Sequence, residues 1–295
     1  MRIGYPCINT RIGCTPNRTF RLASYSEERM LETAGWNIKC LERIVEWNIR
    51  HGLLFFRIGS GLIPFGSHPA NNEKWKIRLG DMLYRIGNLI EKGNVRISMH
   101  PDQFVVLNTP HREVLENSTR ELEYHCNVLD LMGLGRDAKV QIHVGGAYGD
   151  KKASVERFVK NFRMLGRNMK RRTVIENDDR LYSLAECLSV SRRCGMPVVF
   201  DSFHHECLNA GEGFREAARS AMRTWKKGDG PLMCDYSSQK KGARRGSHAQ
   251  KIDIAHFRNF ISQTKGLDFD IMFEIKNKEK SALRAKKIIS EFLTS

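Results

Sequence analysis

The stretch VVFDSFHH, residues 198–205, shows the pattern on which the interpretation of this chain depends. Its apolar start is typical of a short buried strand. Asp201 follows that apolar run directly, and His204 and His205 come three and four positions after Asp201. A carboxylate and two imidazoles therefore stand at or just beyond the end of the predicted strand, and similar arrangements recur along the chain.

Seven further β-rich runs are comparable to this one in length and composition. They span residues 2–5, 53–58, 95–99, 139–144, 173–177, 232–237 and 269–275, and the run quoted above belongs to a strand predicted at 197–201. Amphipathic helical patterns lie between them, at 26–52, 112–133 and 181–195, and a last one closes the chain at 281–293. The first three of these patterns end in glycine, as a helix C-terminus prefers.

Eight strands, each followed by a helical pattern, predict an α/β fold of the (β/α)8 TIM-barrel type. An open doubly wound sheet is the alternative. No glycine-rich G-x-G-x-x-G loop follows the first strand, which weakens that alternative. Because neither a repeat nor a linker interrupts the pattern, we expect residues 1–295 to form a single TIM-barrel domain.

Residues able to bind a metal ion occur at the ends of six consecutive predicted strands. In chain order they are His100, His143, Glu176, Asp201 with His204 and His205 just beyond it, Asp235 and Glu274, and His248 lies in the basic loop after the seventh strand. The C-terminal ends of barrel strands meet at one mouth, where the active sites of such enzymes lie. Several carboxylates buried together are very costly unless a cation compensates them. The sequence therefore predicts a site for several metal ions.

The ligand types and the charge of the chain indicate the chemistry of that site. Mixed nitrogen and oxygen ligands suit Mn²⁺ or Zn²⁺. Two or three divalent ions a few ångströms apart suit phosphodiester displacement, because they activate water and stabilise the attacking and leaving oxygens. The net charge of +16 indicates a polyanionic partner, with nucleic acid the first candidate. Together these features predict a nuclease.

Composition also bears on where the protein works. Hydrophobic residues make up 41% and charged residues 28% of the chain, as in globular proteins. No run of 18 apolar residues is present, so we expect no membrane span. The first ten residues lack the apolar region of a signal peptide, and we expect a cytoplasmic protein. The eight cysteines include no C-x-x-C pair, and we expect buried free thiols rather than disulfides.

Eight motifs, in order, together resemble the UV damage endonucleases. They are GYPCIN (4–9), FRIGSGLIPFGSHP (56–69), SMHPDQF (98–104), HVGGAYGDK (143–151), ENDDR (176–180), DSFHH (201–205), YSSQ with GSHA (236–239 and 246–249) and EIKNKE (274–279). This family is similar to endonuclease IV in fold and metal cluster. The resemblance implies an endodeoxyribonuclease that incises double-stranded DNA immediately 5′ to cyclobutane pyrimidine dimers and 6-4 photoproducts. That incision would leave a 3′-hydroxyl and start an excision repair pathway.

The resemblance also implies how the ligands divide between the ions. His100, His143 and Glu176 would hold one ion; Glu176, Asp201, Asp235 and Glu274 a second; and His204 and His248 a third. Glu176 would thus bridge two ions and be catalytic. We expect His205 to be a bystander, because adjacent side chains rarely point at one ion. Mn²⁺ is the preferred cofactor, with Zn²⁺, Mg²⁺ and Co²⁺ as alternatives.

Two positions depart from the family pattern. The family carries His at the position of Asp235 and a modified Lys at the position of Met233. The two positions share one face of the strand because they are two residues apart. Aspartate can still bind a hard cation, whereas methionine is not a comparable ligand. The third site therefore lacks one ligand of the family pattern, which water or phosphate would have to replace.

DNA contacts follow from the same resemblance. The implied residues are Tyr5, Asn9, His68, Gln103, Phe104 and, in the basic loop KKGARRGSH, Lys240, Lys241, Arg244 and Arg245. Gln103 and Phe104 stand where the family has a Gln-Tyr loop that enters the duplex, and they could fill the gap left by extruded bases. Lys276, two residues past Glu274 and predicted on the same strand face, could offset transition-state charge as a catalytic residue.

Two rival functions remain open at this point. The first is a barrel sugar isomerase or epimerase, which would also place carboxylates and histidines at strand ends. The charge of the chain argues against it, because a neutral sugar needs no strongly basic protein. The second is a catalytically impaired protein that binds damaged DNA, which Met233 and Asp235 suggest. The expected state is a monomer that acts on DNA and not on a membrane.

Overall fold

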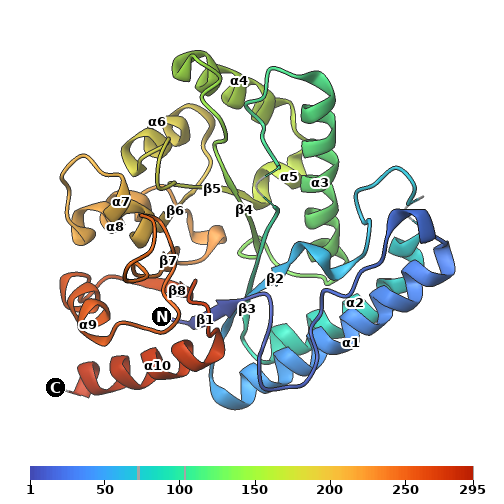
Figure 1. Ribbon diagram of the computed structural model, residues 1–295, viewed down its shortest axis with the longest axis horizontal. Coiled ribbons are helices and arrows are strands. Elements are labelled where there is room, and N and C mark those ends of the chain that lie inside the picture. The colour runs from blue at the N-terminus through green and yellow to red at the C-terminus, as the bar shows by residue number, and fades with distance from the viewer. Residues whose placement is uncertain (72–73, 103, 295) are drawn as a thin grey trace.

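The computed structural model describes residues 1–71, 74–102 and 104–294. Eight parallel strands close into a barrel in sequence order, with β8 pairing to β1 (Figure 1). The strands are β1 (Ile3–Pro6), β2 (Phe55–Gly59), β3 (Arg96–His100), β4 (Lys139–His143), β5 (Thr173–Glu176), β6 (Val198–Asp201), β7 (Leu232–Tyr236) and β8 (Phe269–Phe273). The predicted TIM barrel is confirmed, and both ends of every predicted strand lie within two residues of the ends of the corresponding observed strand.

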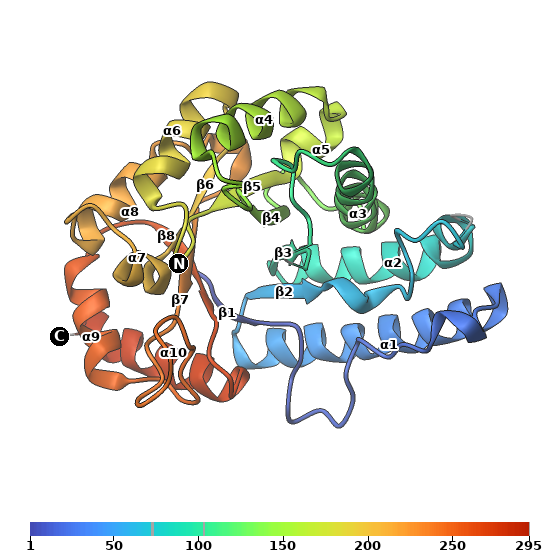
Figure 2. The same ribbon diagram turned by 45° about the horizontal axis from the view of Figure 1, so that its top comes forward.

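Helices surround the strands, as the two views in Figures 1 and 2 show. They are α1 (Glu27–His51), α2 (Trp75–Lys92), α3 (Arg112–Leu131), α4 (Lys151–Met164), α5 (Arg167–Arg172), α6 (Leu184–Cys194), α7 (Ser202–Cys207), α8 (Phe214–Met222), α9 (Ile254–Gln263) and α10 (Glu279–Thr294). The four predicted helical segments correspond to α1, α3, α6 and α10. Local signals explain their ends, since Ser26 caps α1 and left-handed glycines terminate α1 and α6.

Apolar side chains fill the middle of the barrel in a layer separate from the larger core between strands and helices. The interior cluster consists of Phe55, Val174, Val199, Met233 and Met272. Successive strand residues point to opposite faces, so the residue two positions after an interior residue is also interior. Arg57 follows Phe55 in this way on β2, and Asp235 follows Met233 on β7. The predicted shared face of positions 233 and 235 is thereby confirmed.

A separate polar layer closes the barrel at the N-terminal ends of its strands. Lys139 Nζ lies 2.6 Å from Asp229 Oδ1, and Arg96 Nη1 lies 3.0 Å from Asp270 Oδ2. All four side chains are buried. Because each buried charge has a partner, this end stays closed without exposing the apolar layer. The opposite end, at the C-terminal ends of the strands, carries the candidate site.

The cysteines depart from the expectation in one place. Cys14, in the loop between β1 and α1, forms a disulfide with Cys40 of α1, so the prediction of free thiols is wrong for this pair. The loop folds back along α1 and brings the two thiols together, which spacing in the sequence could not reveal. The other six cysteines are free, as predicted. In the described part of the chain, no helix combines the length and apolar character needed to cross a membrane.

Candidate metal centre

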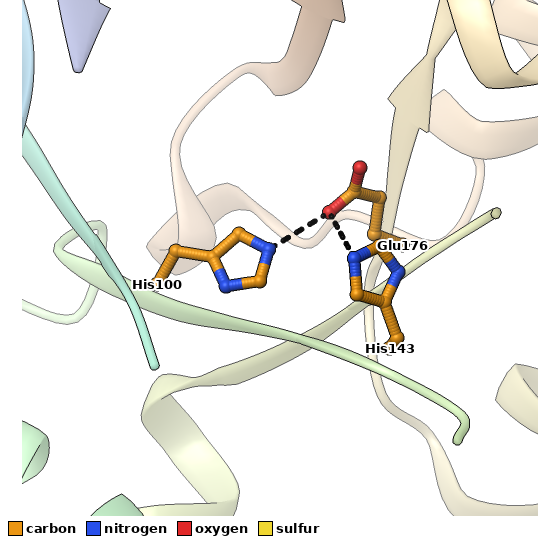
Figure 3. A group of neighbouring side chains, drawn as sticks. All are labelled: His100, His143 and Glu176. Carbon is orange, nitrogen blue, oxygen red and sulfur yellow. Dashed lines mark ion pairs between the residues drawn. The ribbon is translucent and has the colours of Figure 1, made fainter. Parts of the chain in front are cut away.

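Glu176, the last residue of β5, lies at the centre of the polar cluster. Its buried Oε2 atom is 3.3 Å from His100 Nε2 and 3.7 Å from His143 Nε2 (Figure 3). The two histidines are the last residues of β3 and β4, and the strand register places His143 beside Glu176. Three neighbouring strands thus direct three potential ligands to one point, and these residues form a group able to hold a metal ion.

A second group shares Glu176 and lies toward the next strand. It consists of Glu176, Asp201 and His204. The Nδ1 atom of His204 is 3.2 Å from Glu176 Oε1 and 3.3 Å from Asp201 Oδ2. Asp201 ends β6 and caps α7, because its Oδ1 accepts hydrogen bonds from the backbone N–H groups of Phe203 and His204. This short helix is what turns His204 back toward Glu176.

One carboxylate oxygen in this group is available to a cation. The Oδ2 atom of Asp201 is buried and forms no hydrogen bond among the described residues, although His204 Nδ1 lies 3.3 Å away as an ion-pair contact. A bound cation would compensate a buried carboxylate oxygen that has no hydrogen bond. The Nδ1 atom of His100 lies 2.7 Å from the carbonyl oxygen of Pro101. A donor at Nδ1 leaves Nε2 free to act as a ligand, the usual way in which a protein orients a metal-binding histidine.

The electrostatics of the two groups also favour a cation. Burial raises the pKa of Glu176, but the field of His143 and hydrogen bonds from His100 and His204 outweigh burial and hold that pKa well below its usual range. Burial lowers the pKa of His204, yet the field of Asp201 together with Glu176 raises it to about 12. Without a metal ion, His204 therefore carries a proton that compensates the carboxylates.

Asp201 shows the remaining excess of negative charge. Burial raises its pKa well above the usual value, the field of His204 opposes this, and the fields of Glu176 and Glu274 add to the rise. A divalent cation would offset this rise, because it stabilises the ionised form of the carboxylate. The nitrogen and oxygen donors at this mouth therefore fit divalent ions.

Three predicted ligands lie outside these two groups, in the part of the chain that the structure describes. Both Oδ atoms of Asp235 are 2.8 Å from Arg57 Nη2, and Arg57 Nη1 pairs with Glu274 Oε1. His248 contacts the same region, since its Nδ1 lies 2.7 Å from the carbonyl oxygen of Glu274. His205 points elsewhere, with its Nε2 2.9 Å from the carbonyl oxygen of Glu212, consistent with a bystander role.

Arg57 and Gln141 are polar residues of the mouth that the interpretation of the sequence missed. Both are buried, and Gln141 Nε2 donates hydrogen bonds to Glu176 and to Asp235. The signal that could have found Arg57 is its place in FFRIG, two positions after Phe55, on the interior face of β2. Gln141 occupies the corresponding position two residues before His143 on β4.

The two loop residues expected at the lesion that the structure describes are exposed. Phe104 is 78% exposed, and His68 is exposed on the loop between β2 and α2. Both line a cavity of about 850 Å³ that also includes Asp102 and Val114. Gln103 lies outside the described residues. An exposed aromatic ring beside a cavity of this size could stack on a base.

Tyr5 and Asn9 lie inside the protein instead of on a DNA-facing surface. Both side chains are buried. Tyr5 donates a hydrogen bond of 2.6 Å to Asn48 Oδ1, and Asn9 Nδ2 donates one of 2.7 Å to Tyr5 Oη. The reason is the register of β1, which directs Tyr5 outward from the barrel against α1. In this structure the pair stabilises the start of the β1–α1 loop.

The basic loop forms a hairpin-like turn that returns to the candidate centre. Its exposed basic residues are Lys240, Lys241, Arg244 and Arg245. Gln239 and His248 form an antiparallel bridge at its base, and the side chain of Gln239 donates to the carbonyl oxygen of Arg244. The loop thus presents four cations while its last residue, His248, lies beside Glu274.

Lys276 differs from the prediction in its local structure. Strand β8 ends at Phe273, so Glu274 and Lys276 lie beyond it and the argument from a shared strand face is wrong. The backbone N–H of Glu274 still donates to the carbonyl oxygen of Tyr236, and the backbone N–H of Lys276 donates to that of Ala249 in the preceding loop. The side chain of Lys276 is exposed.

The fold and the site together define a TIM-barrel enzyme with a candidate centre for several metal ions at its catalytic mouth. The model of the family UV-endonuclease UvdE matches residues 1–293, and the chain belongs to this family of endonucleases. A UV DNA damage endonuclease of Clostridium perfringens (strain 13 / Type A) is 38% identical over 99% of this chain and 71% of that protein.

Solved structures agree with this assignment. The crystal structure of SacUVDE superposes with a TM-score of 0.94 at 45% identity, over 99% of both chains. Endonuclease IV from Thermus thermophilus shares the fold, with a TM-score of 0.57 at 15% identity over 87% of this chain and 95% of that one. The expected resemblance to the UV damage endonucleases is confirmed.

Proposed function

We propose that the protein is a divalent-metal-dependent repair endonuclease that incises double-stranded DNA immediately 5′ to UV photoproducts and leaves a 3′-hydroxyl. The observation that carries the proposal is the pair of ligand groups that share Glu176 at the mouth of the barrel. Membership of the UV-endonuclease family supports the same substrate, and the curated relative from Clostridium perfringens is named for UV DNA damage.

The described residues divide the work at such a centre. His100 and His143 with Glu176 would hold one divalent ion, and Asp201 and His204 with Glu176 a second. When bound, divalent ions would lower the pKa of water and stabilise negative charge on phosphate oxygens. The mixed imidazole and carboxylate donors favour Mn²⁺, and Zn²⁺, Mg²⁺ and Co²⁺ are the alternatives. Glu176 belongs to both groups, so its carboxylate would contribute to both ions.

The surrounding loops would hold the DNA. Lys240, Lys241, Arg244 and Arg245 would bind phosphates, and this contribution should weaken as salt rises. Phe104 would stack on a base next to the lesion, with His68 lining the same cavity. A photoproduct weakens stacking, so extruding the damaged bases costs less than extruding intact ones. This difference would direct incision to damaged sites.

Incision of a defined substrate tests the proposal. A 5′-labelled duplex that carries one cyclobutane dimer is incubated with the protein and Mn²⁺, with and without excess chelator. We expect one labelled product that ends immediately 5′ to the lesion and can be extended by a polymerase, which requires a 3′-hydroxyl. Incision of the undamaged duplex at the same rate, or incision that is unaffected by chelator, would contradict the proposal.

A further inference from the structure

Arg57 is a buried cation at the mouth of the barrel that the proposed metal chemistry does not use. Its Nη2 atom donates to both carboxylate oxygens of Asp235 at 2.8 Å, and its Nη1 pairs with Glu274 Oε1. The same Nη2 lies 3.0 Å from Gln141 Oε1. The guanidinium thus contacts two carboxylates, Asp235 through Nη2 and Glu274 through Nη1, and its permanent charge compensates both of them.

Gln141 connects this pairing to the candidate metal ligands. Its Oε1 accepts from Arg57, while its Nε2 donates to Asp235 and to Glu176. The amide therefore has a donor on one side and acceptors on the other, which defines its orientation. A continuous network runs from Arg57 on β2, across β4 and β7, to the residue shared by both ligand groups.

The charges at the mouth can be balanced by the Arg57 side chain together with two divalent ions. Four carboxylates face this region, from Glu176, Asp201, Asp235 and Glu274. With Arg57 contributing one positive charge and two divalent ions contributing four, the region would carry a net charge of one positive before DNA binds. A third divalent ion would raise this excess to three positive charges. Buried charge is costly when it is not compensated, so two ions match the carboxylates better than three.

Met233 points to the same conclusion. It lies directly below Asp235 on the interior face of β7 and packs in the apolar cluster with Phe55 and Met272. No oxygen or nitrogen ligand is available at that position. An ion near Asp235 would therefore have to compete with Arg57 for both carboxylate oxygens and would gain no ligand from Met233.

We propose that Arg57 takes the place of a divalent ion in this protein, so that the centre holds two ions and Asp235 acts as a positioning residue instead of a metal ligand. Asp235 fixes the position of Arg57, and Gln141 links Arg57 to Glu176 by hydrogen bonds to both. The inference rests on the proposed metal centre and deepens it, because it assigns the number of ions and the role of Asp235.

The number of metal ions bound per purified full chain, measured without DNA, tests the proposed role of Arg57. The protein is stripped of metal, titrated with Mn²⁺, and free Mn²⁺ is measured by its electron paramagnetic resonance signal. We expect two tightly bound ions per chain in the wild type. Asp235→Asn keeps the size of the side chain but removes its charge, and we expect it still to bind two ions. Three tightly bound ions in the wild type would overturn the proposal, and so would the loss of a bound ion in Asp235→Asn.

Two substitutions of Arg57 test whether the charge of its side chain, as opposed to its shape, limits the number of bound ions. Arg57→Met frees two carboxylates, and we expect a third Mn²⁺ to bind; unchanged stoichiometry in the folded variant would count against the proposal. Arg57→Lys keeps the charge, and we expect it to stay at two ions. Circular dichroism checks that each variant folds, and if Arg57→Met does not fold, Asp235→Asn still decides the question.

The outcome is distinguishable from failure of the proposed function. Two bound ions without incision of damaged DNA would contradict the endonuclease mechanism and leave the role of Arg57 standing. Incision by a chain that binds three ions would support the endonuclease and contradict the role of Arg57.

Discussion

The Nδ1 atom of His204 lies 3.2 Å from Oε1 of Glu176, although the two residues belong to different βα units of the barrel. The field of Asp201 together with Glu176 overcomes burial and raises the pKa of His204 to about 12. His204 is therefore protonated at neutral pH when no metal is bound. A divalent ion that uses this histidine must displace the proton.

Mn²⁺ affinity should consequently rise with pH. Because the proton is released on binding, the apparent affinity should increase by up to about tenfold per pH unit between pH 6 and 8 for each proton displaced. Calorimetric titrations in buffers of different ionisation enthalpy measure the released protons directly. The exposed His111 provides a matched control, and His111→Gln should behave as wild type. Affinity that does not change with pH would show that His204 is not displaced.

Glu176→Gln should abolish incision and leave binding of damaged DNA within about an order of magnitude of wild type. The substitution removes the charge shared by both ligand groups while preserving size. Binding should persist because the basic residues proposed to bind phosphates lie on another loop. Gel shift and nicking assays on the same duplex separate the two effects. Glu116→Gln, on the exposed face of α3, is the control and should nick normally. Normal nicking by Glu176→Gln would remove the multi-metal mechanism.

Phe104→Ala should weaken binding to damaged duplex by about 1–3 kcal/mol, the usual scale for base–aromatic stacking. Phe104→Tyr should be nearly silent, because stacking needs the ring and not a hydroxyl. Competition between irradiated and intact duplex measures the preference for damage. Tyr84→Ala, another exposed aromatic residue but on α2, should leave the preference unchanged. Equal weakening of both duplexes by Phe104→Ala would make Phe104 a scaffold residue.

Neutralising the basic loop should weaken binding to damaged and intact DNA alike. Replacing Lys240, Lys241 and Arg244 by alanine removes three exposed charges that we propose contact phosphates and not bases. Each lost contact should reduce the slope of log affinity against log salt by about one. Lys92→Ala is the control, because Lys92 ends α2 just before β3, at the opposite end of the barrel. A loss confined to damaged DNA would instead place this loop at the lesion.

Local patterns were sufficient to predict the barrel and the core of the candidate site. The strands could be recognised because apolar runs of four to six residues alternate with helical patterns that end in glycine. Parallel strands in a barrel direct their C-terminal ends to one mouth, so the sequence alone was enough to group His100, His143, Glu176 and Asp201. The spacing after Asp201 placed both His204 and His205 near this group, and the family resemblance favoured His204.

Other features depended on contacts between distant segments. Arg57 and Asp235 are separated by 178 positions, and only closure of the barrel brings the guanidinium to that carboxylate. The disulfide between Cys14 and Cys40 forms because a loop folds back along α1, and Tyr5 is buried because the register of β1 turns it toward that helix. Periodicity along a chain reports which face a side chain occupies, but its partner across the barrel is decided by tertiary packing, since that depends on how all eight strands close.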